Sequence, residues 1–339
     1  MKLIYPEYMD GFKCSASACC DNCCIGWEID IDEVTLERYR SLTLGDGTPI
    51  IEQTEGEGTR HFKLCEDGRC FFLDKNNLCK IISCHGEECV PEICREHPRY
   101  YSAFPDLTEA GLGLCCEEAC RLILTAPLPI RFKVRDDGED GRGEDADEIL
   151  TLCRKYRKDL FDMIFDKRTS VSMMTELMLS TCVGIEAICF GIKTGAEPTE
   201  DELAELDDDV EMSDALGKFL DTLEGLEALD KEWSENIKKA RKALQDEPHC
   251  PEELMRGGRD GHIRRLLFYF LHRYLLEGVP DLTIAARVRL SVYSSLTVLL
   301  LSYIEEDESL EALCLAAKSF SKNVEYSTDN VDALIDALM

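Results

Sequence analysis

Apolar side chains recur at helical spacing along most of the chain, and this pattern predicts a mainly helical protein. In the segment 30–42, Asp32 stands where an N-cap belongs, and Leu36, Tyr39 and Leu42 follow at three-residue intervals. A second segment, 263–275, carries one apolar face made by Ile263, Leu266, Leu267, Phe270, Tyr274 and Leu275. Gly278 and Pro280 then end this pattern, as expected of residues beyond a helix C-terminus.

Two further segments, 285–304 and 330–339, continue the helical pattern to the end of the chain. The longest apolar stretch, 290–304, is short for a bilayer and contains several serines, so we expect a buried helix there. The first 14 residues hold no apolar stretch of signal-peptide length, because Glu7 and Asp10 interrupt them. We therefore expect a cytoplasmic protein.

Composition divides the chain into three zones. We predict a cysteine-rich iron–sulfur or metal-binding domain at 1–125, an acidic linker at 126–148 and a helical domain at 149–339. The expected fold class is mainly α, with the cysteine-rich N-terminal region packed with the helical C-terminal domain. A second acidic run, 197–214, contains ten carboxylates and is typical of an exposed loop with a helix inside it.

Charge restricts the partners. The chain has 68 acidic and 38 basic residues, a formal net charge of −30. Nucleic acid and anionic membrane would meet like charge, so we expect the protein to bind neither. The same charge keeps the protein soluble and favours basic partners.

Cysteine usage indicates metal chemistry. The chain has 19 cysteines, an odd number, and 14 of them precede residue 121. Cytosolic thiols stay reduced, so this pattern favours metal or iron–sulfur ligation over disulfides. One zinc ion or one four-iron cluster takes about four thiolates, and the region offers more than three times as many. His85 and His97 lie among the cysteines and could replace a thiolate as ligands.

The run 14–24 holds five of these cysteines. If 19–24 is helical, Cys19 and Cys23 share one face and Cys20 and Cys24 share the next. Adjacent cysteines such as Cys23 and Cys24 then suit a multi-iron cluster, or two nearby sites, better than a single ion. The spacing C-x3-C-x2-C of radical enzymes is absent, as are phosphate-binding, zinc-protease and serine-hydrolase motifs. The residues alone indicate a helical metal-binding protein and reveal no reaction.

Several motifs resemble those of the flagellin lysine N-methylases, within a wider group of zinc- or iron-chelating proteins with a C-x2-CC core. The most specific is FKCSASACCDNCCIGWEIDID at 12–32. Further matching stretches are CFFLDKNNLC (70–79), ICREHPRYYSAFPD (93–106), GLGLCCEEACRLIL (111–124), RLLFYFLHRYLLEG (265–278) and FSKNVEYSTDN (320–330). The resemblance therefore covers nearly the whole chain.

The resemblance also implies a set of ligands. The cysteines that match the family pattern, and so are expected to hold the cofactor and its metal, are Cys14, Cys19, Cys23, Cys24, Cys70, Cys79, Cys94 and Cys116. Those outside the pattern are Cys20, Cys65, Cys84, Cys89, Cys115 and Cys120. Phe71 replaces an expected proline and Tyr326 an expected histidine, so no catalytic duty is assigned to a histidine there.

The implied activity is transfer of a methyl group from S-adenosylmethionine to lysine side chains of flagellin. The implied cofactor is an iron–sulfur cluster, in the 4Fe–4S form, with zinc as the other possibility. A cationic sulfonium favours nearby carboxylates and aromatic faces. Glu28, Asp30, Asp32 and Trp27 adjoin the cysteine run and are candidates for this role. The catalytic base is not identified.

Two other functions fit the same residues. One is a non-catalytic cytosolic metal- or iron–sulfur-binding protein, such as a chaperone or redox sensor, favoured by the cysteines outside the family pattern. The other is a structural zinc module on a helical interaction domain.

Overall fold

The structure is a computed structural model that describes residues 2–19, 22–26, 28–136, 146–196, 211–229, 231–247, 250–255, 257–305 and 307–339. The fold is mainly α with a cysteine-rich N-terminal region, as predicted, and it also contains a small sheet that the sequence did not predict. Most of the acidic run 134–148, and the loop predicted before residue 211, lie outside the described residues.

Contacts divide the chain into two compact units. The helical unit contains Met1–Gly11, Tyr101–Cys115 and Cys120–Met339, and the cysteine unit contains Phe12–Tyr100 with Cys116–Ala119. The chain therefore enters the cysteine unit after its first strand and returns afterwards. The predicted domains 1–125, 126–148 and 149–339 stay a prediction, because contact units do not show which parts fold independently.

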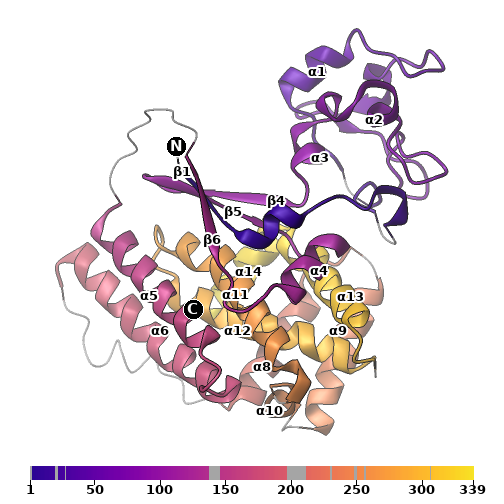
Figure 1. Ribbon diagram of the computed structural model, residues 1–339. Helices are drawn as coiled ribbons and strands as arrows, with labels where there is room; N and C mark the ends of the chain where they lie inside the picture. Colours follow the sequence, from indigo (N-terminus) through magenta and orange to yellow (C-terminus); the bar gives the residue numbers. More distant parts are fainter. Residues whose placement is uncertain are drawn as a thin grey trace. The chain divides into compact units, whose positions relative to one another are not determined.

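A four-stranded sheet opens the helical unit (Figure 1). Its order is β4 (Arg99–Ala103), β5 (Leu107–Leu112), β1 (Lys2–Pro6) and β6 (Phe132–Asp136). β1 pairs with β5 in parallel and with β6 in antiparallel register. Local periodicity does not predict this sheet, because the parallel partners are separated in sequence by the whole span 12–100.

Strand β6 lies within the range 126–148 that is predicted as a linker from the sequence. Phe132–Asp136 pair with β1 along their full length, from Pro6↔Phe132 to Lys2↔Asp136. The sequence FKVRD alternates apolar and polar side chains, which is a strand pattern, and the acidic composition of the residues that follow obscured it.

Ten helices of the described chain belong wholly or partly to the helical unit. They are α4 (Glu117–Thr125), α5 (Glu148–Phe165), α6 (Val171–Thr194), α8 (Met212–Gly225), α9 (Lys231–Asp246), α10 (Cys250–Leu254), α11 (Asp260–Tyr274), α12 (Ile284–Tyr303), α13 (Leu310–Phe320) and α14 (Thr328–Leu338). Side-chain caps at Asp147, Ser170, Ser309 and Ser327 start α5, α6, α13 and α14. Short helical turns occupy Glu7–Gly11, Gly257–Arg259, Leu275–Gly278 and, as a π-helix, Ser321–Glu325.

Helix α12 is the core helix of this unit, contacting α6, α8, α9, α10, α11, α13 and α14. The predicted apolar face at 263–275 is buried on α11 and its extension, and the turn that follows ends at Gly278, as predicted. The helix predicted at 285–304 is α12, which spans Ile284–Tyr303, and its apolar stretch is buried as predicted.

Two described helices, α6 and α12, have the length and composition of a membrane span. The apolar window of α12 is 89% buried, as expected of a core helix, whereas that of α6 is 33% buried.

A buried ion pair joins the sheet to the helices. Glu109 on β5 accepts two hydrogen bonds from Arg157 on α5, at 2.7 and 2.5 Å, and the His272 ring on α11 lies 3.7 Å from the same carboxylate. The Glu109 and Arg157 side chains are only 7% and 9% exposed. Removing one partner would leave the other charge buried and uncompensated, which is costly.

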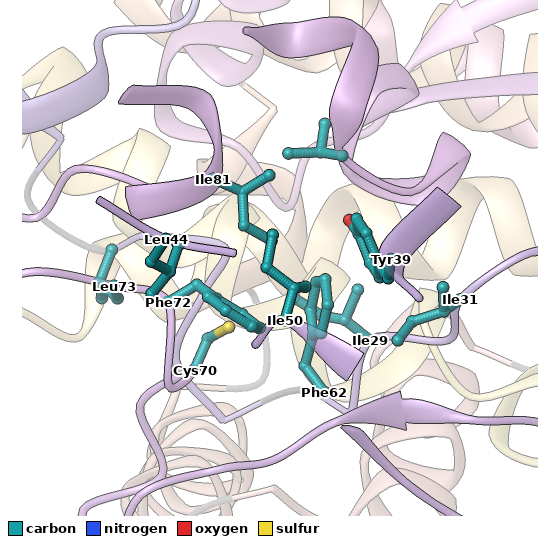
Figure 2. Packing of buried hydrophobic residues seen from close by; sticks show 11 residues of the cluster. Ile29, Ile31, Tyr39, Leu44, Ile50, Phe62, Cys70, Phe72, Leu73 and Ile81 are labelled. Carbon is teal, nitrogen blue, oxygen red and sulfur yellow. The ribbon is translucent and has the colours of Figure 1, made fainter. Parts of the chain in front are cut away.

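The cysteine unit has short elements around a small core. Its regular segments are η2 (Ala16–Ala18), α1 (Glu33–Tyr39), η3 (Ile51–Gln53), β2 (Thr54–Glu55), β3 (His61–Phe62), α2 (Lys80–His85), η4 (Glu87–Cys89) and α3 (Glu92–Glu96). Helix α1 begins at the predicted N-cap, because the Asp32 carboxylate accepts the Thr35 N–H. Figure 2 shows the core, built from Ile29, Ile31, Tyr39, Leu44, Ile50, Phe62, Cys70, Phe72, Leu73, Ile81 and Val90.

We predict that Glu109→Gln lowers the free energy of unfolding of the helical unit by about 3 kcal/mol or more, because it strands the buried Arg157 charge. The matched control is Asp106→Asn, which breaks a bidentate contact to Arg154 on the same helix. Asp106 is 32% exposed, so the control should cost about 1 kcal/mol or less. Urea unfolding measures both; equal losses would contradict this account.

Acid should weaken the same contact. Burial raises the pKa of Glu109, but Arg157 more than offsets this, so the pKa lies below its ordinary 4.5. The Glu109 carboxylate therefore contributes to the free energy of unfolding above about pH 4.5, and this contribution is lost as the pH falls further. Burial lowers the pKa of His272 to about 4, so between pH 6.5 and 4 protonation favours the unfolded chain. As the pH falls below 4.5, the free energy of unfolding should therefore decrease less in Glu109→Gln than in the unaltered protein.

Candidate functional site

The core of the cysteine unit has sulfur atoms around it. Cys70 is buried within the core beside Phe72 (Figure 2), and Cys24, Cys79, Cys89 and Cys94 pack against it. All but Cys89 belong to the predicted ligand set. Cysteines from four separate segments are thus gathered around one small apolar cluster.

Backbone hydrogen bonds hold these segments together. The Cys70 N–H donates to the Cys24 carbonyl at 2.7 Å, and Leu73 forms an isolated β-bridge with Cys79. The Tyr39 hydroxyl donates to the Cys89 carbonyl at 2.7 Å. The buried phenol of Tyr39 thereby fixes the segment that leads into α3, where Cys94 lies.

The gathered thiols influence one another's ionisation. A hydrogen bond with Cys23, and then burial, raise the pKa of Cys24, with further contributions from Cys70 and Cys94. Burial, and then the charges of Cys23, Cys79 and Cys70, raise the pKa of Cys94. Burial raises the pKa of Cys70 to about 11, with added contributions from Cys79 and Cys65. Several thiolates can therefore form together only when a positive charge compensates them.

Two predicted ligands stand at helix starts. Cys79 precedes α2, and the backbone N–H groups of Ile81 and Ile82 act to lower the pKa of its thiol. Cys116 precedes α4, and the N–H groups of Glu118 and Ala119 act on its thiol in the same way. These N–H groups favour a thiolate, yet burial outweighs them, so the pKa of Cys79 is raised and that of Cys116 is raised to about 11.

Most of the predicted ligands form one electrostatic group. In seven of the eight, the charge of one thiol affects the pKa of another. Cys19 and Cys23 raise the pKa of Cys116, and Cys23 raises the pKa values of Cys24, Cys79 and Cys94. Cys14 is exposed, and its sulfur accepts the Ala16 N–H at 3.4 Å. Within the described residues, no three His, Cys, Asp or Glu side chains already converge as ligands of one ion.

The conditional helix at 19–24 does not form in the described part of that run. Ala16–Ala18 make a single 3-10 turn, Cys19 is extended, and Cys23 and Cys24 lie in a turn. Helical faces therefore do not order these sulfurs. Cys20 lies outside the described residues.

Cys89 lies outside the predicted ligand set, yet it packs against the same core as Cys79 and Cys94. These cysteines share a regular spacing, because Cys84, Cys89 and Cys94 recur every five residues. Cys65 and Cys84, also outside the set, act electrostatically on Cys70 and Cys79.

The other predicted residues have varied roles. His85 Nε2 lies 2.8 Å from the Thr43 carbonyl oxygen, and burial lowers the pKa of His97 to about 4. Asp32 accepts N–H groups of Thr35 at 2.8 Å and Glu92 at 3.1 Å, so it links α1 to α3. Glu28 and Asp30 are exposed, and Trp27 lies outside the described residues.

The distal motif 320–330 forms a polar network in the helical unit. Glu325, whose side chain is 1% exposed, accepts hydrogen bonds from Tyr269 at 2.9 Å and Tyr274 at 2.9 Å, and Arg273 lies 3.4 Å away. The next residue, Tyr326, places its hydroxyl 2.7 Å from the Cys115 sulfur. The network thus anchors the chain immediately before Cys116.

No protein-family model and no solved structure matches the chain. Among curated proteins, the flagellar biosynthetic protein FliU of Salmonella muenchen is 29% identical over 129 residues, 36% of this chain and 76% of that protein. The lysine-N-methylase of Salmonella typhimurium is also 29% identical over 129 residues, as is that of Salmonella choleraesuis.

The matched part covers only 32% of either lysine-N-methylase. The similarity to them is therefore partial in both chains. It supports the resemblance of this chain to the flagellin lysine methylase family.

Proposed function

We propose that this protein is an S-adenosylmethionine-dependent lysine N-methyltransferase that acts on flagellin and holds an iron–sulfur cluster on the thiols of the cysteine unit. One observation carries the proposal: a chain with partial identity to lysine-N-methylases gathers four cysteines of the predicted ligand set around one small core. We propose the 4Fe–4S form because such a cluster binds about four cysteine thiolates, and the cysteine unit offers at least that many.

The donor chemistry supports an iron–sulfur group. The side chains are soft thiols, and two of them, Cys79 and Cys116, stand at helix starts, where backbone N–H groups favour the thiolate. N–H groups near cluster sulfurs tune the cluster. The ligands would come from Cys19, Cys23, Cys24, Cys70, Cys79, Cys94 and Cys116, with Cys14 reaching the site by movement of its exposed segment. Binding would draw together sulfurs that are near one another but not yet converged.

Binding would also add stability where the core is small. Eleven buried residues and short helices carry the fold of this unit. Units of this size have little apolar surface to bury, and metal ligation often supplies the missing folding free energy. The cluster would therefore stabilise the cysteine unit, where we propose that the methyl donor binds.

The reaction sets its own requirements. The lone pair of a lysine nitrogen attacks the methyl carbon, the carbon–sulfur bond breaks, the sulfonium becomes a neutral thioether, and the nitrogen loses a proton. The lysine must first be neutral, although its ordinary pKa is about 10.4. Glu28 and Asp30 are the exposed carboxylates beside the cysteine run and remain candidates to face the sulfonium. Asp32 is committed to capping α1.

The proposed location is the cytoplasm, where thiols remain reduced until they bind metal. The net charge of −30 favours approach of a lysine-bearing segment and disfavours nucleic acid or anionic membrane. Flagellin is proposed as the protein substrate because both kinds of relative carry flagellar or lysine-methylase names.

The first prediction concerns the ligands. Cys94→Ser should abolish iron and acid-labile sulfide in anaerobically purified protein, together with absorbance in the cluster region, because it removes a core-facing sulfur. Cys84→Ser is the matched control: it is an exposed cysteine of the same unit, outside the family pattern, and should keep the cluster. Equal loss in both variants would reject the assignment, and zinc without sulfide would favour a structural zinc module.

The second prediction concerns activity. Cluster-loaded protein with S-adenosylmethionine should raise the mass of purified flagellin in steps of about 14 Da, the mass of one methylene, at lysine. Intact-mass and peptide analysis measure this, and reactions without the methyl donor are the control. No gain with fully loaded protein, and no binding of S-adenosylmethionine, would favour a non-catalytic metal-binding protein.

A further inference from the structure

A second pair of thiols lies in the helical unit, away from the predicted ligand set. Cys153 on α5 and Cys189 on α6 place their sulfurs 3.6 Å apart and share a hydrogen bond. Both side chains are 0% exposed. Neither belongs to the family cysteine pattern, and both lie on helices whose mutual packing is extensive.

The position of the pair within the helix hairpin matters. Helices α5 and α6 are joined by 166–170, so the start of α5 and the end of α6 form the open end of the hairpin. Cys153 is in the second turn of α5, and Cys189 is in the second turn from the end of α6. A covalent link here would close the hairpin opposite its connecting loop.

The geometry allows this link with small movements. A disulfide has an S–S distance of about 2.05 Å, so the two sulfurs need to approach by roughly 1.5 Å, which is within the range of side-chain rotation. Cys182 is also buried on α6 but is seven residues from Cys189. Its sulfur donates to the Leu179 carbonyl at 3.0 Å, so it serves as a matched control.

We propose that Cys153 and Cys189 form a reversible disulfide when the protein meets hydroperoxide, which makes the α5–α6 hairpin a redox-modification site. Cys189 releases its proton, its thiolate attacks the peroxide oxygen, and the O–O bond breaks; the leaving hydroxide takes up the released proton, so a sulfenic acid and water form. The Cys153 sulfur then attacks the Cys189 sulfur, and the hydroxyl leaves with the thiol proton as a second water. Two thiols are thus oxidised and one peroxide is reduced.

The shared hydrogen bond supports this order of steps. It raises the pKa of Cys153 and lowers that of Cys189, so Cys189 ionises first. The thiolate is the reactive form. Access occurs through opening of the helix ends, where α5 begins and α6 finishes, because terminal turns open most readily.

A Cys153–Cys189 disulfide would also restrain the residues of α5 that contact the sheet. Cys153 directly precedes Arg154, which binds Asp106, and lies one turn before Arg157, which binds Glu109. Fixing this turn of α5 to α6 therefore restrains the residues that connect α5 to the sheet. The inference does not depend on the proposed methyl transfer, because the pair lies outside the proposed ligand set.

The test is thiol mapping of the full chain after hydrogen peroxide, with denaturation in N-ethylmaleimide and digestion without reductant. We expect a linked peptide pair containing Cys153 and Cys189, lighter by two hydrogens than the free peptides together, and lost on dithiothreitol treatment. Cys182→Ala should keep this link, and Cys153→Ala should abolish it. Hydrogen exchange should show greater protection of 171–194 in oxidised protein, and none of this gain in Cys153→Ala.

Two results would overturn the inference. One is full alkylation of Cys153 and Cys189 after a peroxide dose that oxidises the exposed thiols of the chain. The other is Cys189 linked to Cys182 or to another cysteine in place of Cys153.

Discussion

The cysteine unit depends on one constraint: several thiols are packed against a core too small to offset the cost of charging them. Burial and mutual repulsion raise the pKa of Cys24, Cys70 and Cys94, so they stay protonated at neutral pH without a cation. Apolar packing of neutral thiols contributes little because the elements are short. Metal or cluster binding would remove the repulsion and add coordination bonds at the same time. This is the physical basis of the proposed cofactor.

The helical unit is stabilised differently, by a large apolar core. Helix α12 is buried among seven other helices, and its long apolar contacts supply the core. Two buried carboxylates of this unit are paired: Glu109 with Arg157, and Glu325 with two tyrosines and Arg273. These pairs join strands and helices that are distant in sequence.

Sequence patterns predicted what local periodicity determines. The N-cap at Asp32 and the buried face from Ile263 to Leu275 follow directly from side-chain spacing. The sheet was missed because β1 pairs with β5 across a long insertion, and β6 because its alternating residues run into an acidic tract. Non-local pairing has no signature in a short window. Cysteine composition drew attention to the cysteine unit, but which of its thiols pack against one core depends on folding that cysteine spacing alone does not encode.

The central claim is that a thiol-bound metal centre organises residues 12–100. Hydrogen exchange of the loaded protein, before and after removal of the metal by a chelator under reducing, anaerobic conditions, tests it most directly. The account predicts that amides around Cys24, Cys70 and Cys94 lose protection on removal while α11 and α12 keep theirs. Unchanged protection throughout 12–100, with every thiol bare, would contradict it.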